Sequence, residues 1–358
     1  MRSPVSLISA VLGLALTVAS VYAYQQDQTP RGNDSFRVHL EFFPSWSLWD
    51  DSRNELITSP GYIRPVGPSA RLALIYDVVS GAERSIGIPE DFSAAQFINV
   101  DAIAVGPDGS VLIACDAKLG DGPFAGDRLL LYDNHSSLTM NLPTADYDVG
   151  AVALDKLGNA YVVGDHDDEV SSEDSYPLLV KYDSYGHITL QALSRSLFSN
   201  VDDPIGDAIG DTHSGATRIT VNEKAIEVYL APVNEMIVLN QSGEIQSRVN
   251  VASRLSEFAK TNGYNTLYVD ADEFSPSGDL WLAGRLTDAE NNPTAPRSFH
   301  YFVVRLTPEG ELQVPFNKVE EGPSCPCLPQ LIGFTESNEP VAFSPRGSGY
   351  SIVREGPY

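Results

Sequence analysis

Short apolar runs separated by turn residues recur along most of this chain. In one clear example the run 100–105 is followed by the turn Pro107-Asp108-Gly109 and then by the apolar run 111–114. A variable segment and another apolar run at 129–133 complete the unit. Runs of this length, rich in Val, Ile, Leu and Tyr and bounded by Gly, Pro, Asn or Asp, predict short β-strands joined by hairpins.

The same order of strands and turns returns along the chain. Two clear copies and two weaker copies are found at 150–187, 269–311, 217–244 and 331–354. The segment 71–82 supplies the outer half of another unit, and its inner half is expected at 36–43. This gives six units of four short strands each, with a spacing of about 45 to 60 residues.

A single four-stranded sheet cannot bury both of its faces, whereas six sheets packed radially can. We therefore predict an all-β fold, a six-bladed β-propeller over residues 36–358 with four-stranded blades. The last segment, which ends near Arg354, is expected to share its blade with the N-terminal strand and so to close the ring. An open β-solenoid is the rival architecture, and the unit length favours the propeller.

Two stretches carry a resemblance to a known group of proteins. They are Gly106-Pro107-Asp108-Gly109-Ser110-Val111 followed by Leu130-Leu131-Tyr132-Asp133, and 274–282 followed by 304–310. Both resemble NHL-type and SMP-30-like six-bladed propellers, and the chain looks like a secreted bacterial member. The resemblance implies the fold. Such propellers include secreted binding proteins, lactonases of the gluconolactonase type, a streptogramin lyase and protein-interaction modules, and no catalytic motif of the enzymatic members matches here.

The N-terminus has the pattern of an export signal. Arg2 precedes an apolar stretch at 5–19, and Val21-Tyr22-Ala23 places small residues at the −3 and −1 positions of a cleavage site. Residues 1–23 are therefore predicted to be a signal peptide and 24–35 a flexible N-terminus, so the protein is expected to be secreted or periplasmic. An uncleaved signal anchor is the alternative, and no later stretch approaches transmembrane length.

Charge narrows the class of partner. The chain carries 48 Asp and Glu against 23 Lys and Arg, a net charge of −25. Such a surface repels phosphate backbones and anionic lipid, which argues against nucleic-acid or membrane partners. It suits a soluble monomer outside the cytoplasm, or one that binds cations.

The cysteines do not form a recognisable motif. The count of three, at 115, 325 and 327, excludes a fully paired set. Cys325-Pro326-Cys327 lacks the spacing of redox or zinc sites. Thiols without a catalytic role are expected, and a bridge from Cys115 to one of the other two is the alternative.

Topology predicts where function would sit. The tight turns after the first and third strands should lie at one end of the ring, here called the turn face. The links after the second strand and between units should lie at the other end, here called the loop face, which is the candidate working face. Its connections are long and acidic, with Asp165-His166-Asp167-Asp168-Glu169 as one cluster and further acids at 116, 121, 127, 202, 203, 207 and 211.

Particular residues are expected at the mouth of the central channel. Asp101 and Asp270 occupy equivalent positions, eight residues before their turn glycines, and are placed at the start of the innermost strands. With Asp148, Asp272 and His213 they are the candidates for binding a ligand or metal. Converging carboxylates hold hard cations, so Asp101 and Asp270 are the metal candidates, with Ca²⁺ or another divalent cation as the ion. Solvated loop charges are the alternative.

Two functions follow from this pattern. The first is an exported propeller that binds a small molecule or protein partner through its acidic loop face, without catalysis. The alternative is a metal-dependent hydrolase or lyase of the lactonase-propeller type.

Trp46 and Trp49 are a possible aromatic platform for a ligand, or they pack at the edge of the closing blade. Helical spacing at 253–261 predicts a short helix across the loop face.

Overall fold

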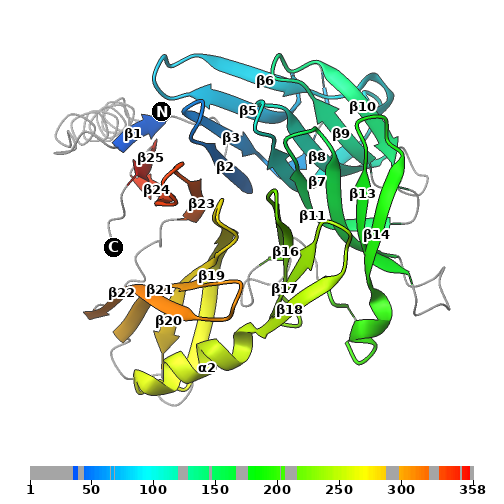
Figure 1. Cartoon of the computed structure of the whole chain (residues 1–358). Coiled ribbons are helices and arrows are strands. Elements are labelled where there is room, and N and C mark those ends of the chain that lie inside the picture. The colour runs from blue at the N-terminus through cyan, green and yellow to red at the C-terminus, as the bar shows by residue number, and fades with distance from the viewer. Residues whose placement is uncertain are drawn as a thin grey trace, which may run out of the picture.

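A computed structural model shows how the strands are arranged. It describes residues 35–38, 44–64, 66–67, 69–119, 128–144, 147–166, 176–201, 203–205, 216–287, 298–321, 330–346 and 349–354. The described strands form six antiparallel sheets, which follow one another in chain order around a common centre (Figure 1). The protein is therefore an all-β propeller. Within these ranges no helix is long and apolar enough to cross a membrane.

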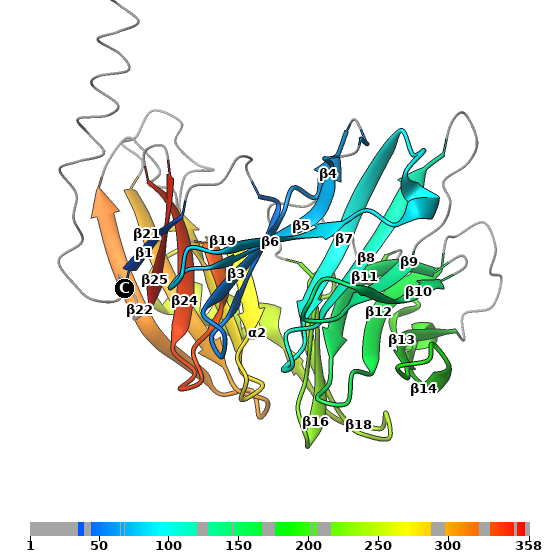
Figure 2. The ribbon, with the colours of Figure 1, turned by 90° about the horizontal axis from the view of Figure 1, so that it is seen from above.

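Each sheet is a short antiparallel ladder. The first sheet contains β2 (Trp46–Asp50), β3 (Glu55–Ser59), β5 (Arg71–Asp77) and β6 (Glu83–Gly87), and the second contains β7 (Phe97–Val105), β8 (Val111–Lys118), β9 (Arg128–Tyr132) and β10 (Leu138–Pro143), with β4 (Tyr62–Ile63) added beside β7. The third contains β11 (Tyr147–Leu154), β12 (Ala160–His166), β13 (Pro177–Tyr182) and β14 (Ile188–Ser194), and the fourth contains β15 (Arg218–Val221), β16 (Ala225–Leu230), β17 (Glu235–Asn240) and β18 (Ile245–Asn250). The fifth contains β19 (Thr266–Phe274), β20 (Leu280–Thr287), β21 (Ser298–Leu306) and β22 (Leu312–Glu321). The remaining sheet joins the two ends of the described chain: β1 (Ser35–Val38) pairs with β25 (Gly349–Arg354), followed by β24 (Pro340–Arg346) and β23 (Gln330–Phe334). In both ribbon views β1 lies beside β25 (Figures 1 and 2).

The predicted hairpin turns share one geometry. In the turns after the first strand, Gly109, Gly158 and Gly278 have φ of 80°, 76° and 87°. Each donates its backbone N–H to the carbonyl oxygen three residues earlier, as Gly109 does to Gly106 at 2.9 Å. Because a side chain disfavours this left-handed conformation, glycine at these positions sets the turn.

Apolar clusters hold the sheets together. Within the described residues, each sheet shares a buried cluster with the next, from the sheet of β2 round to the sheet of β23. One further cluster joins the last sheet to the first, where Ile332 and Val341 pack with Trp49 and Leu56. At the same junction the Glu336 N–H donates to Asp51 Oδ2 at 3.0 Å. The ring is therefore closed by packing as well as by strand pairing.

Two strand predictions were wrong. The inner half of the first unit is not at 36–43 but is β2 and β3, and residues 35–38 instead pair with β25. The innermost strands also begin about three residues earlier than predicted: β7 starts at Phe97, β11 at Tyr147 and β19 at Thr266. The reason is that β8, β12 and β20 continue past the predicted strand ends and pair with these early residues, so Asp116, Asp165 and Arg285 lie in strands rather than in loops.

The predicted helix is confirmed as α2 (Val251–Thr261), which links β18 to β19. The Asn250 side chain caps its N-terminus by accepting the Ser253 N–H at 2.7 Å. Leu255, Phe258 and Ala259 are buried on its inner side.

Cys115 is buried in β8, whereas Cys325, Cys327 and the predicted signal peptide lie outside the described residues.

A buried carboxyl group sits between two sheets. Glu227 in β16 is 2% exposed and accepts hydrogen bonds from Asn222 Nδ2 at 3.1 and 3.3 Å. The turn glycine Gly278 of the next sheet packs directly against it. Burial, with a contribution from the Asp279 charge, raises the pKa of Glu227 from 4.5 to about 7.

Glu227 should therefore make the stability of the protein depend on pH. The native state holds this proton more tightly than the unfolded chain, so the free energy of unfolding should fall as pH rises from 4.5 to about 7. The loss attributable to Glu227 is about 3 kcal/mol. Urea unfolding across this range should show a flatter pH profile for Glu227→Gln than for the native protein. Superimposable profiles would mean that Glu227 does not bind a proton preferentially in the folded state.

Candidate functional site

The innermost strands share an irregularity that positions two of the predicted residues. A β-bulge interrupts the β7–β8 ladder between Val100 and Ala102, and another interrupts β19–β20 between Val269 and Ala271. Asp101 and Asp270 are the bulged residues. Both are therefore fifth in their strands and not at the strand start, which corrects the predicted position. Their equivalence in the repeat is real, because the same bulge falls at Gly150 and at Ile332 in two other inner strands.

The two bulged aspartates have different partners. Asp270 accepts two hydrogen bonds from Arg285 in β20, from Nε to Oδ2 at 2.8 Å and from Nη2 to Oδ1 at 2.6 Å. Asp101 is 8% exposed, and its Oδ1 accepts the Asn99 Nδ2–H at 2.6 Å. Asp270 is therefore half of a bidentate ion pair, whereas Asp101 is held by a neutral amide.

Asp148 lies next to a carboxylate that the sequence analysis had placed in a loop. Asp116 is opposite Asn99 in the β7–β8 ladder, and Asp148 is at the start of β11 in the next sheet. Desolvation of the half-buried Asp116, reinforced by the Asp148 charge, raises the pKa of Asp116 to about 6. Two acidic side chains thus lie close enough for their charges to interact across the junction of two sheets.

A third carboxylate at this end is already engaged. Asp165, opposite Asp148 in the β11–β12 ladder, accepts a hydrogen bond from Tyr176 Oη and forms an ion pair with Arg195 Nε at 3.4 Å. Burial nevertheless raises its pKa. His166 lies edge-on to the rings of Tyr147 and Tyr176, with centroids 5.3 and 4.7 Å away. This arrangement packs the histidine among aromatic rings.

A short strand pairs with the inner edge of β7. β4, in the connection between β3 and β5, pairs with the inner edge of β7, with Tyr62 opposite Asn99 and Ile63 opposite Ile98. The Val100 N–H also donates to the Gly61 carbonyl at 2.6 Å. Because edge strands leave backbone groups unpaired, β4 satisfies those of β7 beside Asp101. Two residues are too few for a strand to be visible in a hydrophobic pattern.

Asp272 is far more buried than its neighbour Asp270. It is 2% exposed and accepts hydrogen bonds from Arg218 Nε at 3.1 Å and from the Ala216 N–H at 2.9 Å. Burial raises the pKa of Asp272, and the Arg218 charge opposes that rise. The pair joins β19 to β15 of the preceding sheet, so Asp272 is a structural bridge between two sheets.

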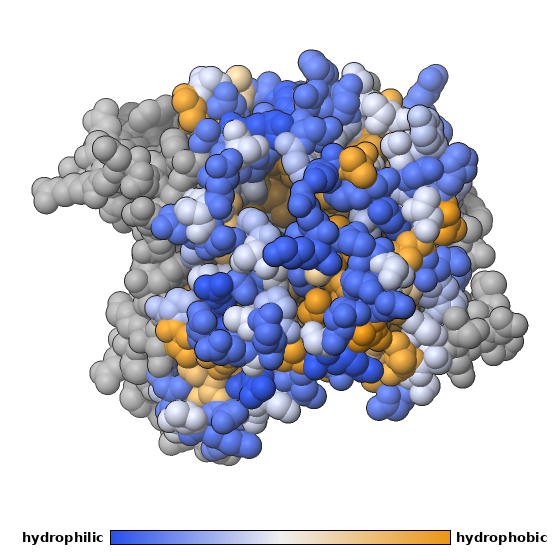
Figure 3. All heavy atoms as spheres, viewed as in Figure 1, coloured by the Kyte–Doolittle hydropathy of each residue, from blue (hydrophilic) through white to orange (hydrophobic). Residues whose placement is uncertain are grey.

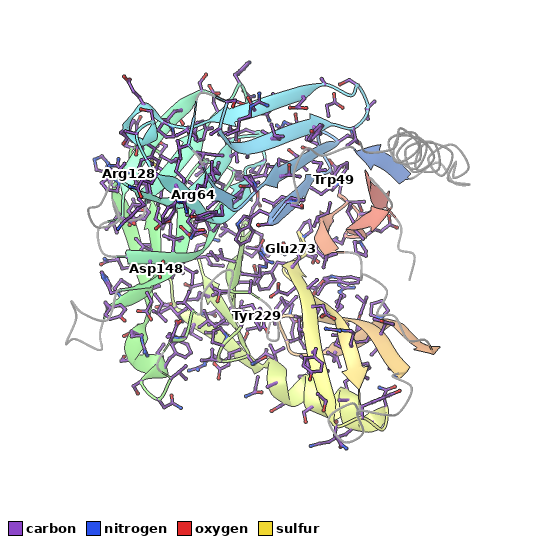
Figure 4. The ribbon with its side chains drawn as sticks, turned by 180° about the vertical axis from the view of Figure 1, so that it is seen from behind. Trp49, Arg64, Arg128, Asp148, Tyr229 and Glu273 are labelled. Atoms are coloured by element: carbon purple, nitrogen blue, oxygen red, sulfur yellow. The ribbon has the colours of Figure 1, made fainter. Side chains whose placement is uncertain are left out.

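The channel contains a cavity of about 360 Å³. It is lined by residues of all six innermost strands, β2, β7, β11, β15, β19 and β23, and it reaches the turn face at Pro107 and Pro276. Its wall is largely aliphatic and aromatic and includes Trp46 and Trp49. Glu273 also lines it, and this residue lies near the centre of the ring (Figure 4). The end of the ring seen in Figure 3 is mainly hydrophilic, with apolar residues in several groups.

The structure brings together some of the predicted residues and leaves others apart. Asp101 and Asp148 lie in the inner strands of neighbouring sheets, Asp101 in mid-strand and Asp148 at the strand start, whereas Asp272 faces Arg218 between β15 and β19. His213 and the acids at 121, 127, 202, 207 and 211 lie outside the described residues. Over the described ranges no group of three or more His, Cys, Asp or Glu could hold a metal ion. Sequence reasoning missed Arg218 and Glu273, which no motif marks.

Comparisons with known proteins find only distant structural similarities. No family model matches the chain, and no curated protein matches it. Among solved structures, a streptogramin B lyase matches with a TM-score of 0.43 and 10% identity over 89% of this chain and 96% of its own. Regucalcin, a calcium-binding protein from Agrobacterium tumefaciens, matches with a TM-score of 0.42 and 13% identity over 91% and 96%. A Bacteroides fragilis protein proposed to be exported matches with a TM-score of 0.48 and 10% identity over 92% and 97%. These distant similarities concern the β-propeller fold alone.

Proposed function

We propose that this protein is an exported, monomeric, six-bladed β-propeller that binds a cationic ligand or a cationic segment of a protein partner at its acidic loop face, without catalysing a reaction. The six packed sheets support the blade count, and the signal-like N-terminus supports export. Binding at a loop-face rim on a rigid ring is how such scaffolds commonly carry function.

The pair Asp116 and Asp148 carries this proposal. The two carboxylates repel each other, and Asp116 Oδ1 is buried without a hydrogen-bond partner in the part of the chain that is described. A positive group placed beside the two carboxylates would relieve the repulsion. The net charge of −25 would attract such a ligand over a longer range.

The enzymatic alternative has less support from the described residues. A metal-dependent hydrolase or lyase of the lactonase-propeller type would hold a divalent cation between Asp101 and Asp270. Both oxygens of Asp270 accept hydrogen bonds from Arg285, so a cation there would have to displace a bidentate ion pair. Binding without catalysis is therefore the function proposed first.

Calorimetric titration with a pentalysine peptide, and separately with Ca²⁺, tests the proposal. The native protein should bind the peptide, and the variant Asp116→Asn/Asp148→Asn should bind it about tenfold or more weakly. Removing these charges should not unfold the protein, because burial disfavours the charged form of Asp116. Ca²⁺ binding that is lost in Asp101→Asn and retained in Asp116→Asn/Asp148→Asn would instead favour the enzymatic alternative.

The matched control removes two charges at the other end of the ring. Glu309 and Glu336 are exposed in tight turns of the turn face. Glu309→Gln/Glu336→Gln should leave the peptide affinity close to that of the native protein. If both double variants bind the peptide equally weakly, the attraction is non-specific and the proposed site is wrong. Absence of peptide binding by the native protein would also overturn the proposed site.

A further inference from the structure

The cavity inside the channel differs in chemistry from the acidic rim. Its volume of about 360 Å³ is in the range of small-molecule sites. Except for β7, which pairs with β4, the innermost strands are the edges of their sheets, so their inner backbone groups also face this space. Apolar walls with a few polar groups are typical of sites that bind small ligands.

One of these polar groups is a guanidinium. Arg218 enters the cavity from β15, with its side chain 21% exposed. Its Nε donates to Asp272, and its guanidinium lies 5.8 Å from the centre of the Trp46 ring. The two terminal nitrogens make no hydrogen bond with any described residue, although four N–H hydrogens are available there. Arg218 is therefore anchored at one nitrogen and open at the other two.

The other polar group is a carboxylate. Glu273 in β19 lines the same cavity, and its Oε1 accepts the Phe274 N–H at 3.0 Å. Burial raises the pKa of Glu273, and the Arg218 charge opposes that rise. Among the described residues, however, the two side chains form no ion pair within 4.0 Å. The guanidinium of Arg218 and the carboxylate of Glu273 thus line one cavity without forming an ion pair with each other.

We infer that this cavity is a binding site for a small zwitterion, such as a free α-amino acid with an apolar side chain. The ligand carboxylate would accept hydrogen bonds from the terminal nitrogens of Arg218, and the ligand ammonium would donate to the carboxylate of Glu273. The apolar side chain would lie against Trp46 and the aliphatic walls. This site is separate from the loop-face pair Asp116 and Asp148, and it does not rest on the proposed function.

Calorimetric titration with three probes tests the inference. L-leucine should bind, whereas 3-methylbutylamine and 4-methylpentanoate, which keep the side chain but lack one of the charges, should each bind about tenfold or more weakly. An amine that binds as tightly as leucine would overturn the zwitterion site in favour of a simple cation site. No leucine binding by the native protein would overturn it outright.

Variants assign the ends of the ligand. Glu273→Gln keeps the acceptor for the Phe274 N–H and should lower leucine affinity about tenfold, with little change in melting temperature. Arg218→Lys keeps the positive charge opposite Asp272 but loses the planar guanidinium. It should therefore lower the affinity for leucine more than the affinity for 3-methylbutylamine. Asp116→Asn/Asp148→Asn should leave leucine affinity unchanged, so failure of this site and failure of the loop-face site are distinguishable. Unchanged leucine binding in both Glu273→Gln and Arg218→Lys would place the ligand elsewhere.

Discussion

Replacing Gly284 with alanine is expected to destabilise the protein by about 3 kcal/mol or more. Gly284 in β20 lies opposite Val269, where the bulge brings the two strands close together. A Cβ at this position would be 2.0 Å from the Tyr268 carbonyl oxygen and 2.9 Å from the Phe302 ring. The oxygen belongs to the backbone, so relief requires the ladder itself to move.

Urea or thermal unfolding measures this effect, and Gly87→Ala is the matched control. Gly87 ends β6, where nothing lies within 4 Å of an added Cβ. That variant should unfold within about 0.5 kcal/mol of the native protein. Gly164, at the equivalent bulge in β12, should behave like Gly284, because its Cβ would be 2.1 Å from the Asp148 carbonyl oxygen. Equal stability of Gly284→Ala and Gly87→Ala would show that the bulge does not constrain the site.

Replacing Asp272 with alanine is the second change with a large expected effect. It removes the acceptor of the Arg218 Nε–H and of the Ala216 N–H, and it leaves the guanidinium without its closest counter-charge. Breaking a buried pair from one side costs about 3–5 kcal/mol, because the remaining charge is left in a poorly solvated position. The partial exposure of Arg218 places the expected loss toward the lower end of that range.

A double-mutant cycle separates the ion pair from simple loss of packing. Arg218→Met leaves the more deeply buried charge of Asp272 unpaired, so it should cost at least as much as Asp272→Ala. Asp272→Ala/Arg218→Met should be more stable than the sum of the single losses predicts. Unfolding by urea for the four proteins gives the coupling energy. Strict additivity would mean that the two side chains do not stabilise the sheets as a pair.

The fold could be predicted from local pattern because a propeller repeats local units. The turns at Gly109 and Gly278 need a positive φ, which glycine adopts readily, so these turns can be recognised from the sequence. The apolar runs between such turns predict the central strands. The first sheet was misplaced for a physical reason. Its inner strand, Trp46–Asp50, contains a serine and an aspartate, and it is buried mainly by neighbouring sheets that sequence periodicity does not reveal.

The site was predicted less well than the fold. Asp101 and Asp270 were recognised as equivalent, because the repeat itself carries that information. Their environments could not be predicted, since Arg285 is 15 residues from Asp270 along the chain and meets it only through the register of β19 and β20. Arg218 and Asp272 are 54 residues apart and belong to different sheets. Contacts of that kind depend on the packing of whole sheets.

The pairing of β1 with β25 has a consequence for the order in which the molecule assembles. Residues 35–38 are synthesised before the other five sheets, whereas their hydrogen-bonding partners at 350–353 are synthesised after them. β1 therefore stays without its partner until those five sheets have been made. Deleting 349–354 should therefore leave β1 and β24 without their strand partner, and these edges would be open to proteases and to strand exchange with another copy.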